Sequence, residues 1–338
     1  MSSPTRSLCY VNDGTPGITR KRRGRYWQYF DAKGKRIADR AEIDRLNAIG
    51  MPPAYERVWL CPDPNGHIQG VGYDARGRKQ YRYHPDFRAR QDNSKFDRLA
   101  EFGRQLPKLR KRVEADIAGK ATSCEAVIAA VVRLIDASWM RVGNEEYTKE
   151  NKSFGATTLR NRHVSVTGDK LKISYPGKHG VRQTVTVTDR RLARIARRTQ
   201  DLPGQNLFEF LDGDGCTRPV TSTDVNAYIR DAMGEEFTAK DFRTWGASVV
   251  AFEEMVGRAD DTRAIGIKRM IAPVAEALGN TAAISRKSYV HPALIEAAKD
   301  AKAVGDGDLP RATKYLSRAE RGLIDYLKVA RRRRRKAA

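Results

Sequence analysis

The sequence is poor in cysteine and has no long apolar segment. Its four cysteines lie far apart in the 338-residue chain and show no paired spacing: Cys9, Cys61, Cys124 and Cys216. We expect free thiols in a reducing cytoplasm, because a zinc site needs closely spaced ligands. There is no run of about 18 apolar residues and no apolar leader, so nothing in the sequence predicts membrane insertion or export.

The sequence lacks the motifs of two common kinds of phosphate-processing enzyme, those that use ATP and those that use a metal ion. No GxxxxGK[ST] loop is present, so ATP use is not predicted. Metal-dependent nucleases need clustered carboxylates to hold Mg²⁺. The nearest stretch, LDGDGC (211–216), lacks the rest of a calcium loop and is typical of a turn. We therefore expect no cofactor and no metal site.

Acidic residues are outnumbered: 64 Lys and Arg stand against 41 Asp and Glu, giving a net charge of +23 and a pI near 10.0. Such a field attracts polyanions, usually DNA or RNA. A ribosome-like or merely solubilising surface is the alternative, while no long basic amphipathic helix supports membrane binding. Residues 1–90 carry 18 cations and 9 anions and residues 91–338 carry 46 and 32, so both parts can bind the same polyanion.

The first ninety residues show the period of β-strands. YWQYF (26–30) alternates, and ERVWLC (56–61) forms a second run. HIQGVGYD and KQYRYH are separated by the tight DARGR turn, which predicts a hairpin. From Asn93 the period becomes helical, so we place a domain boundary near residue 90.

The rest of the chain has mainly helical patterns. Residues 123–140 carry one apolar face and are expected to end at Gly143, and residues 221–233 begin with cap residues. Thr238 opens another helix, through a capping box with Asp241. Alternation on both sides of PGKHG (176–180) predicts one β-hairpin.

These patterns predict an α+β fold. We expect a small, mainly β N-terminal domain (1–90) and a larger, mainly helical domain with a short β-hairpin (91–330). The low-complexity basic tail (331–338) is expected to be disordered.

The stretch SRKSYVHP (285–292) places one tyrosine, Tyr289, next to cations. A phenol titrates near pH 10 and is a poor nucleophile unless its reaction partner is activated. Attack on a phosphodiester needs cations on the non-bridging oxygens and an acid that protonates the departing alkoxide. Arginine suits the first task because its planar fork binds phosphate through two hydrogen bonds. His291 precedes a proline that holds it extended, which favours a structural or DNA-facing role over acid–base chemistry.

Five blocks supply such helpers in one order along the chain: WMRVGNEEY (139–147), YPGKHG (175–180), KDFRTWGAS (240–248), LGNT (278–281) and SRKSYVHP. They resemble the catalytic blocks of type IB DNA topoisomerases of the poxvirus-like bacterial branch. GYDARGRKQYRYHP (72–85) resembles the N-terminal domain of that branch, so the resemblance covers nearly the whole chain.

The resemblance implies a role for five residues. Tyr289 would be the nucleophile that forms a 3′-phosphotyrosyl link, Arg141 and Arg243 would bind the scissile phosphate, and Lys178 would protonate the leaving 5′ oxygen. Asn280 stands where the family usually has a histidine that hydrogen-bonds a non-bridging oxygen. An asparagine amide still donates a neutral hydrogen bond, so we expect activity to survive with altered strength and pH dependence.

Local patterns predict how these residues are mounted. Arg141 follows a long helix, Lys178 lies at a hairpin tip, and Tyr289 lies in a connector. Arg243 falls in the first turn of its helix, where free N–H groups also favour a phosphate. Taken singly, each residue has an ordinary alternative, such as a surface ion pair or a solvated tip, and only their ordered combination favours catalysis.

The implied activity is relaxation of supercoiled DNA by transient single-strand cleavage and religation. A phosphotyrosine link conserves the energy of the broken bond, so neither ATP nor a metal is required. The implied partner is double-stranded DNA, held by a monomeric C-clamp in the nucleoid-associated cytoplasm. A tyrosine recombinase, whose active sites are coupled in an oligomer, and a non-enzymatic basic DNA-binding protein are the alternatives.

A second set of residues is expected to bind DNA away from the cleavage site. DARGRKQYRYH interleaves cations with tyrosines along a strand, so one face can meet phosphates while the other packs. Aromatics in such a strand are more often core, whereas the resemblance favours DNA contact. The DNA-binding candidates are Arg76, Arg78, Lys79, Tyr81, Arg82 and Tyr83.

Overall fold

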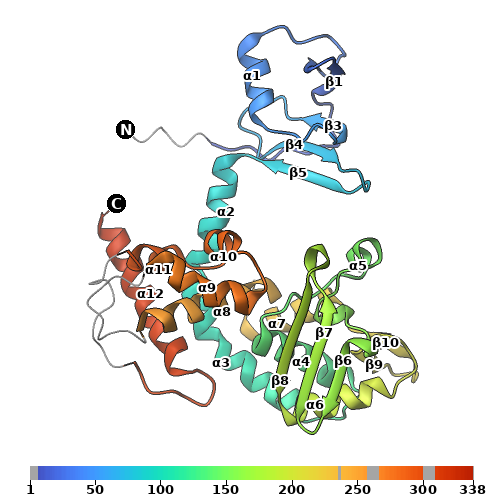
Figure 1. Ribbon diagram of the computed structural model, residues 1–338, viewed down its shortest axis with the longest axis vertical. Helices are drawn as coiled ribbons and strands as arrows, with labels where there is room; N and C mark the ends of the chain where they lie inside the picture. Colours follow the sequence, from blue (N-terminus) through green and yellow to red (C-terminus); the bar gives the residue numbers. More distant parts are fainter. Residues whose placement is uncertain (1–6, 235–236, 257–265, 300–308, 338) are drawn as a thin grey trace. The chain divides into compact units, whose positions relative to one another are not determined.

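The computed structural model describes residues 7–234, 237–256, 266–299 and 309–337. The chain divides into two units, residues 1–94 and 95–338 (Figure 1). The division falls within helix α2 (Pro85–Asp97), which already begins at Pro85, earlier than the helical period that the sequence shows from Asn93.

The N-terminal unit contains antiparallel strands, as the alternating patterns predict. Its strands are β1 (Thr19–Arg23), β2 (Tyr26–Phe30), β3 (Glu56–Leu60), β4 (Ile68–Tyr73) and β5 (Lys79–Tyr83). β1 pairs with β2, and the other three form a sheet in chain order. The unit also holds helix α1 (Arg40–Ala48), which the sequence analysis did not predict. Asp39 caps α1 by accepting a hydrogen bond from the N–H of Glu42.

The second unit is mainly helical. Its helices are α3 (Leu99–Asp116), α4 (Cys124–Ser138), α5 (Glu145–Asn151), α6 (Arg190–Gln200), α7 (Ser222–Met233), α8 (Ala239–Val256), α9 (Ile267–Leu278), α10 (Ala282–Ser288), α11 (Pro292–Ala297) and α12 (Arg318–Ala337). α4 is buried almost all round because α3, α6, α7 and α8 pack against it. It ends at Ser138 and not at Gly143, because Trp139 takes a left-handed conformation with φ 53°.

The β structure of this unit is larger than the single predicted hairpin. β7 (Lys170–Pro176) and β8 (Arg182–Thr188) form that hairpin, and β6 (Val164–Thr167) adds a third strand beside β7. β9 (Glu209–Leu211) and β10 (Thr217–Pro219) form a second hairpin. The turn between them is the LDGDGC stretch, in which the carboxylate of Asp212 accepts hydrogen bonds from the N–H groups of Asp214 and Cys216.

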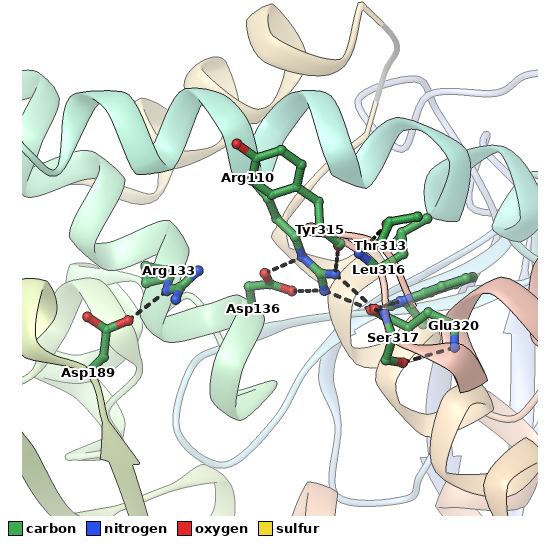
Figure 2. Close-up of polar contacts among 10 residues, drawn as sticks. Arg110, Arg133, Asp136, Asp189, Thr313, Tyr315, Leu316, Ser317 and Glu320 are labelled. Atoms are coloured by element: carbon green, nitrogen blue, oxygen red, sulfur yellow. Dashed lines mark hydrogen bonds and ion pairs between the residues drawn. The ribbon is translucent and has the colours of Figure 1, made fainter. Parts of the chain in front are cut away.

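An ion-pair network ties α12 to the helices of the core (Figure 2). Arg110 in α3 donates two 2.8 Å hydrogen bonds to Asp136 in α4, and two of 2.8 and 2.9 Å to Glu320 in α12. Glu320 also accepts from the indole N–H of Trp245 in α8 at 3.1 Å. The network therefore fixes α8, close to Arg243, against three other helices.

The expected disorder of the basic tail is corrected by the structure. The segment from Arg331 to Ala337 forms the last turns of α12, and Ala338 lies outside the described residues. The first half of α12 packs Leu323, Ile324 and Leu327 into the core. Because Arg and Lys have high helix propensity, the helix continues from this packed half into the basic run.

Within the described residues, no group of three or more His, Cys, Asp or Glu side chains is arranged to hold a metal. Over the same residues, no helix has the length and apolar character needed to span a bilayer.

Candidate active site

Arg243 is the most deeply buried cation of the site, with 5% of its surface exposed. Its Nη1 donates to the carbonyl oxygen of Trp139 at 2.5 Å, and its Nη2 donates to that of Leu278 at 3.0 Å. These carbonyls lie at the C-terminal ends of α4 and α9, where a cation is favoured. The prediction that Arg243 sits in the first turn, near a helix N-terminus, is wrong: it is the fifth residue of α8.

Trp139 supplies one of these carbonyls because of its left-handed backbone. Its indole ring lies so close to Gly246 that a Cβ built there would be 2.3 Å from a ring atom. This close approach of α8 brings Arg243 to the end of α4. Arg141, two residues further along, is thereby placed at the same site.

Arg141 and Asn280 meet directly. Nη2 of Arg141 donates to Oδ1 of Asn280 at 3.0 Å. Since that oxygen accepts, the amide nitrogen of Asn280 faces elsewhere; it is buried and has no hydrogen-bond partner among the described residues. Gly279 places Asn280 by ending α9 in a left-handed conformation with φ 57°.

Tyr289 is the C-cap of α10, with the non-helical φ −129°, and lies in the short connector between α10 and α11, as the sequence predicts. Its ring centroid lies 5.1 Å from Cζ of Arg243. Burial raises the pKa of the Tyr289 phenol, but the charge and hydrogen bond of Arg243, with the charges of Arg141 and Lys178, outweigh burial and lower the pKa below its ordinary value.

Ser248 fixes the backbone on either side of this tyrosine. The Ser248 hydroxyl, fully buried in α8, donates to the carbonyl oxygen of Tyr289 at 3.4 Å and accepts from the N–H of His291 at 3.2 Å. His291 in turn caps α11 by accepting from the N–H of Ala293, which agrees with the first of the two roles expected for it, structural or DNA-facing. The segment that carries the phenol is thus attached to the helix that carries Arg243.

Lys178 lies at the tip of the β7–β8 hairpin, as the sequence predicts, and is exposed. A cavity of about 420 Å³ is lined by Arg141, Arg243 and Tyr289, but Lys178 is not among the residues that line it. The structure therefore brings Tyr289, Arg141, Arg243 and Asn280 together, and leaves Lys178 near enough to act on the phenol only through its charge.

Sequence reasoning missed several residues of the site. Lys240, exposed at the start of α8, lines the cavity and lies on the same helix face as Arg243, three residues later. That spacing inside the KDFRTWGAS block was a usable indication. No comparable pattern pointed to the carbonyl groups of Trp139 and Leu278 or to the Ser248 hydroxyl, because their roles depend on packing between distant segments.

The DNA-binding candidates lie on or beside the β4–β5 hairpin of the N-terminal unit. Arg78 pairs with Asp74 at 2.7 Å, and Lys79 pairs with Asp13 at 2.6 Å. Tyr81 and Tyr83 stack with ring centroids 6.0 Å apart and are 41% and 46% exposed. Aromatic residues of strands are more often buried in a core, but these two tyrosines are exposed.

The remaining two candidates are arginines of the same hairpin. Arg82 in β5 is exposed. Arg76 lies in the turn, where its backbone N–H donates to Asp74.

Comparison with known proteins places the chain in a family. The model for "Eukaryotic DNA topoisomerase I, catalytic core" matches residues 84–314, more than half of the chain, and that for "Bacterial DNA topoisomerase IB, N-terminal domain" matches residues 26–74. DNA topoisomerase 1B of Acanthamoeba polyphaga mimivirus is 34% identical over 286 residues, which cover 81% of this chain and 85% of the relative. The chain belongs to the type IB DNA topoisomerase family.

Other relatives of this type IB topoisomerase are more distant. DNA topoisomerase 1B of vaccinia virus (strain Copenhagen) is 24% identical over 254 residues, covering 73% of this chain and 76% of the relative. A solved structure, XerH site-specific recombinase bound to difH substrate, aligns with 58% of this chain and 52% of its own at 18% identity and a TM-score of 0.37. That likeness is too weak to bear on function.

Family membership confirms the predicted activity. The protein is an isomerase that relaxes DNA through a transient covalent bond to a tyrosine. The recombinase and the non-enzymatic DNA-binding protein, the two alternatives left open by the sequence, are not favoured.

Proposed function

We propose that Tyr289 is the nucleophile of this topoisomerase and that it cleaves one strand of duplex DNA. The phenol gives up its proton to solvent and its oxygen bonds to the scissile phosphorus. The bond from phosphorus to the 5′ oxygen breaks, and that oxygen leaves as a hydroxyl after taking a proton. The reverse exchange reseals the strand. The observation that carries this proposal is that two guanidinium groups, one of them hydrogen-bonded to the Asn280 amide, lie close to a phenol with a lowered pKa.

The phosphate would be bound by donors that the protein leaves unsatisfied. Nε of Arg243 and Nδ2 of Asn280 are buried without a hydrogen-bond partner among the described residues. Such a group costs about 1–3 kcal/mol when it stays unpaired, and a non-bridging phosphate oxygen would accept from it. Arg141 adds the second guanidinium. Fixed donors of this kind stabilise the charge that develops in the transition state.

Lys178 would be the general acid that protonates the leaving 5′ oxygen. Its exposed place at a hairpin tip gives the side chain the reach to approach an oxygen of bound DNA. All five side chains belong to one chain, so a monomer can carry out the reaction. The phosphotyrosine bond retains the energy of the cleaved bond, and we expect relaxation without ATP or added metal.

The N-terminal unit would contribute DNA contacts, so that the two units together enclose the duplex as a clamp. Arg82 and the stacked pair of Tyr81 and Tyr83 present an exposed cation and exposed rings on one strand. Arg82→Gln should reduce the slope of log affinity against log salt by about 0.9 if Arg82 binds one phosphate. Arg40→Gln is the control, since Arg40 pairs with Asp44 on exposed α1. An unchanged slope for Arg82→Gln would contradict the contact.

The proposal is tested by relaxation of supercoiled plasmid in EDTA without nucleotide. We expect the wild-type protein to relax the plasmid, and Tyr289→Phe to bind DNA normally while losing relaxation. Tyr26→Phe, at an exposed tyrosine of the N-terminal unit, should behave as wild type. Failure of the wild-type protein in EDTA, or relaxation by the Tyr289→Phe variant, would refute the proposal.

A further inference from the structure

Gln183 lies between two glycines that flank the proposed catalytic residues. It pairs with Tyr175 across the β7–β8 hairpin, so its side chain shares a face of the sheet with that buried tyrosine. A Cβ built on Gly177 would be 2.7 Å from Cγ of Gln183. A Cβ built on Gly279 would be 2.0 Å from its Oε1 and 2.8 Å from its Nε2. The side chain thus occupies the space that two missing Cβ atoms leave.

These glycines connect Gln183 to both sides of the site. Gly177 immediately precedes Lys178, and its N–H donates to the carbonyl of Val181 at 2.8 Å to close the hairpin turn. Gly279 immediately precedes Asn280 and follows Leu278, whose carbonyl binds Arg243. One side chain therefore contacts the segment that carries the proposed acid and the segment that holds the proposed phosphate ligands.

At Gly177 the glycine is explained by space and not by backbone conformation. Its φ is −85°, which an alanine also adopts. The left-handed conformation of Gly279 favours glycine for its own sake. The close approach to Gln183 is common to both positions.

We propose that Gln183 is a positioning residue for proton transfer. By packing between Gly177 and Gly279 it holds the β7–β8 hairpin against the C-terminal end of α9, and so sets where the Lys178 amine stands relative to the phosphate bound by Arg141, Arg243 and Asn280. This inference rests on the proposed roles of those residues. Gln183 touches no reacting atom; removing it leaves the acid present but misplaced.

The test compares two leaving groups in single-turnover cleavage. On ordinary DNA, Gln183→Ala should bind normally and cleave about 10- to 100-fold more slowly, the cost of a misplaced catalytic group. On DNA with sulfur in place of the 5′ bridging oxygen, the thiolate leaves without protonation. Gln183→Ala and Lys178→Ala should then cleave within a few-fold of wild type, while Arg243→Ala stays slow.

The outcomes separate this inference from the function on which it depends. If the sulfur-containing DNA restores the cleavage rate of Lys178→Ala but not that of Gln183→Ala, then Lys178 is the acid and the positioning role of Gln183 is refuted. If Lys178→Ala is not restored, the proposed acid is itself wrong, and the role of Gln183 falls with it.

Two further variants distinguish positioning from a general loss of structure. Gly177→Ala should slow cleavage of ordinary DNA by displacing Gln183, and Gly177→Ala combined with Gln183→Ala should be no slower than Gln183→Ala alone. Gln183→Met, of similar length, should retain most of the activity. Additive effects in the double variant, with thermal unfolding midpoints unchanged, would overturn the inference.

Discussion

Arg243 donates a 3.0 Å hydrogen bond to the carbonyl oxygen of Leu278, the last residue of α9. Two residues later, Asn280 accepts a hydrogen bond from Arg141. The end of α9 therefore positions both arginines that approach Tyr289. A helix C-terminus is an electrostatically favourable place for two cations that must stay close together without a carboxylate between them.

Arg243→Lys should lower the rate of single-turnover cleavage about 100- to 1,000-fold, as loss of a fixed transition-state donor does in other enzymes. A lysine keeps the charge, but its donors all sit on one nitrogen and do not reproduce the planar fork whose separate nitrogens bind the carbonyls of Trp139 and Leu278. Arg133→Lys is a matched control, because Arg133 pairs with Asp189 away from the site (Figure 2). A rate within threefold of wild type for Arg243→Lys would contradict this account.

Asn280→Asp should impair cleavage more than Asn280→Ala. The aspartate keeps an oxygen for Arg141 but replaces the unpaired Nδ2 donor with a negative charge that repels the phosphate. Cleavage rates of the two variants, measured at saturating DNA, decide the point. If Asn280→Asp were the more active variant, the proposed hydrogen bond from Asn280 to the phosphate would be wrong.

The lowered pKa of Tyr289 predicts a pH dependence. The cationic neighbours favour the phenolate, so its titration should lie below the ordinary tyrosine value near 10, and cleavage should rise with pH through that range. Arg141→Gln should shift the titration upward, since one of the charges that lowers the pKa is removed. The pH dependence of the carbon-13 chemical shift of labelled Tyr289 would measure this pKa. A pKa that does not rise in Arg141→Gln would exclude the electrostatic effect of Arg141.

His291 should make the fold sensitive to acid. Burial is the main cause that lowers the pKa of its imidazole from 6.5 to about 4. The unfolded chain therefore binds more protons between these values, and stability is lost as the pH falls through this window, by about 3 kcal/mol in all. His291→Asn keeps an acceptor for the N–H of Ala293. Urea unfolding from pH 7 to 4 should show a weaker pH dependence for this variant than for wild type.

Much of the site could be predicted because it is carried by short blocks with local causes. Gly279 after an apolar helix, and Thr238 with Asp241 before another, mark the ends of α9 and α8 correctly. The alternating residues around PGKHG correctly place Lys178 at a hairpin tip. These features depend on interactions within a few residues, which a single sequence displays.

The parts that could not be predicted depend on contacts between distant segments. Arg243 binds carbonyls 104 and 35 positions away in the chain, and backbone groups have no sequence pattern of their own. The seven-residue helix α10, which Tyr289 ends, is too short to show an apolar period. The exposure of Tyr81 and Tyr83 also depends on whether other segments pack against β5, and the composition of the strand does not determine this.

The most direct test of the central claim is to trap and map the covalent intermediate. A duplex whose scissile strand ends a few nucleotides beyond the cleavage site releases the short 5′-hydroxyl fragment, so that religation cannot occur. We predict that mass spectrometry of the digested adduct finds a DNA 3′ phosphate on the peptide that contains Tyr289. An adduct on any other residue, or one joined through a 5′ phosphate, would contradict the account.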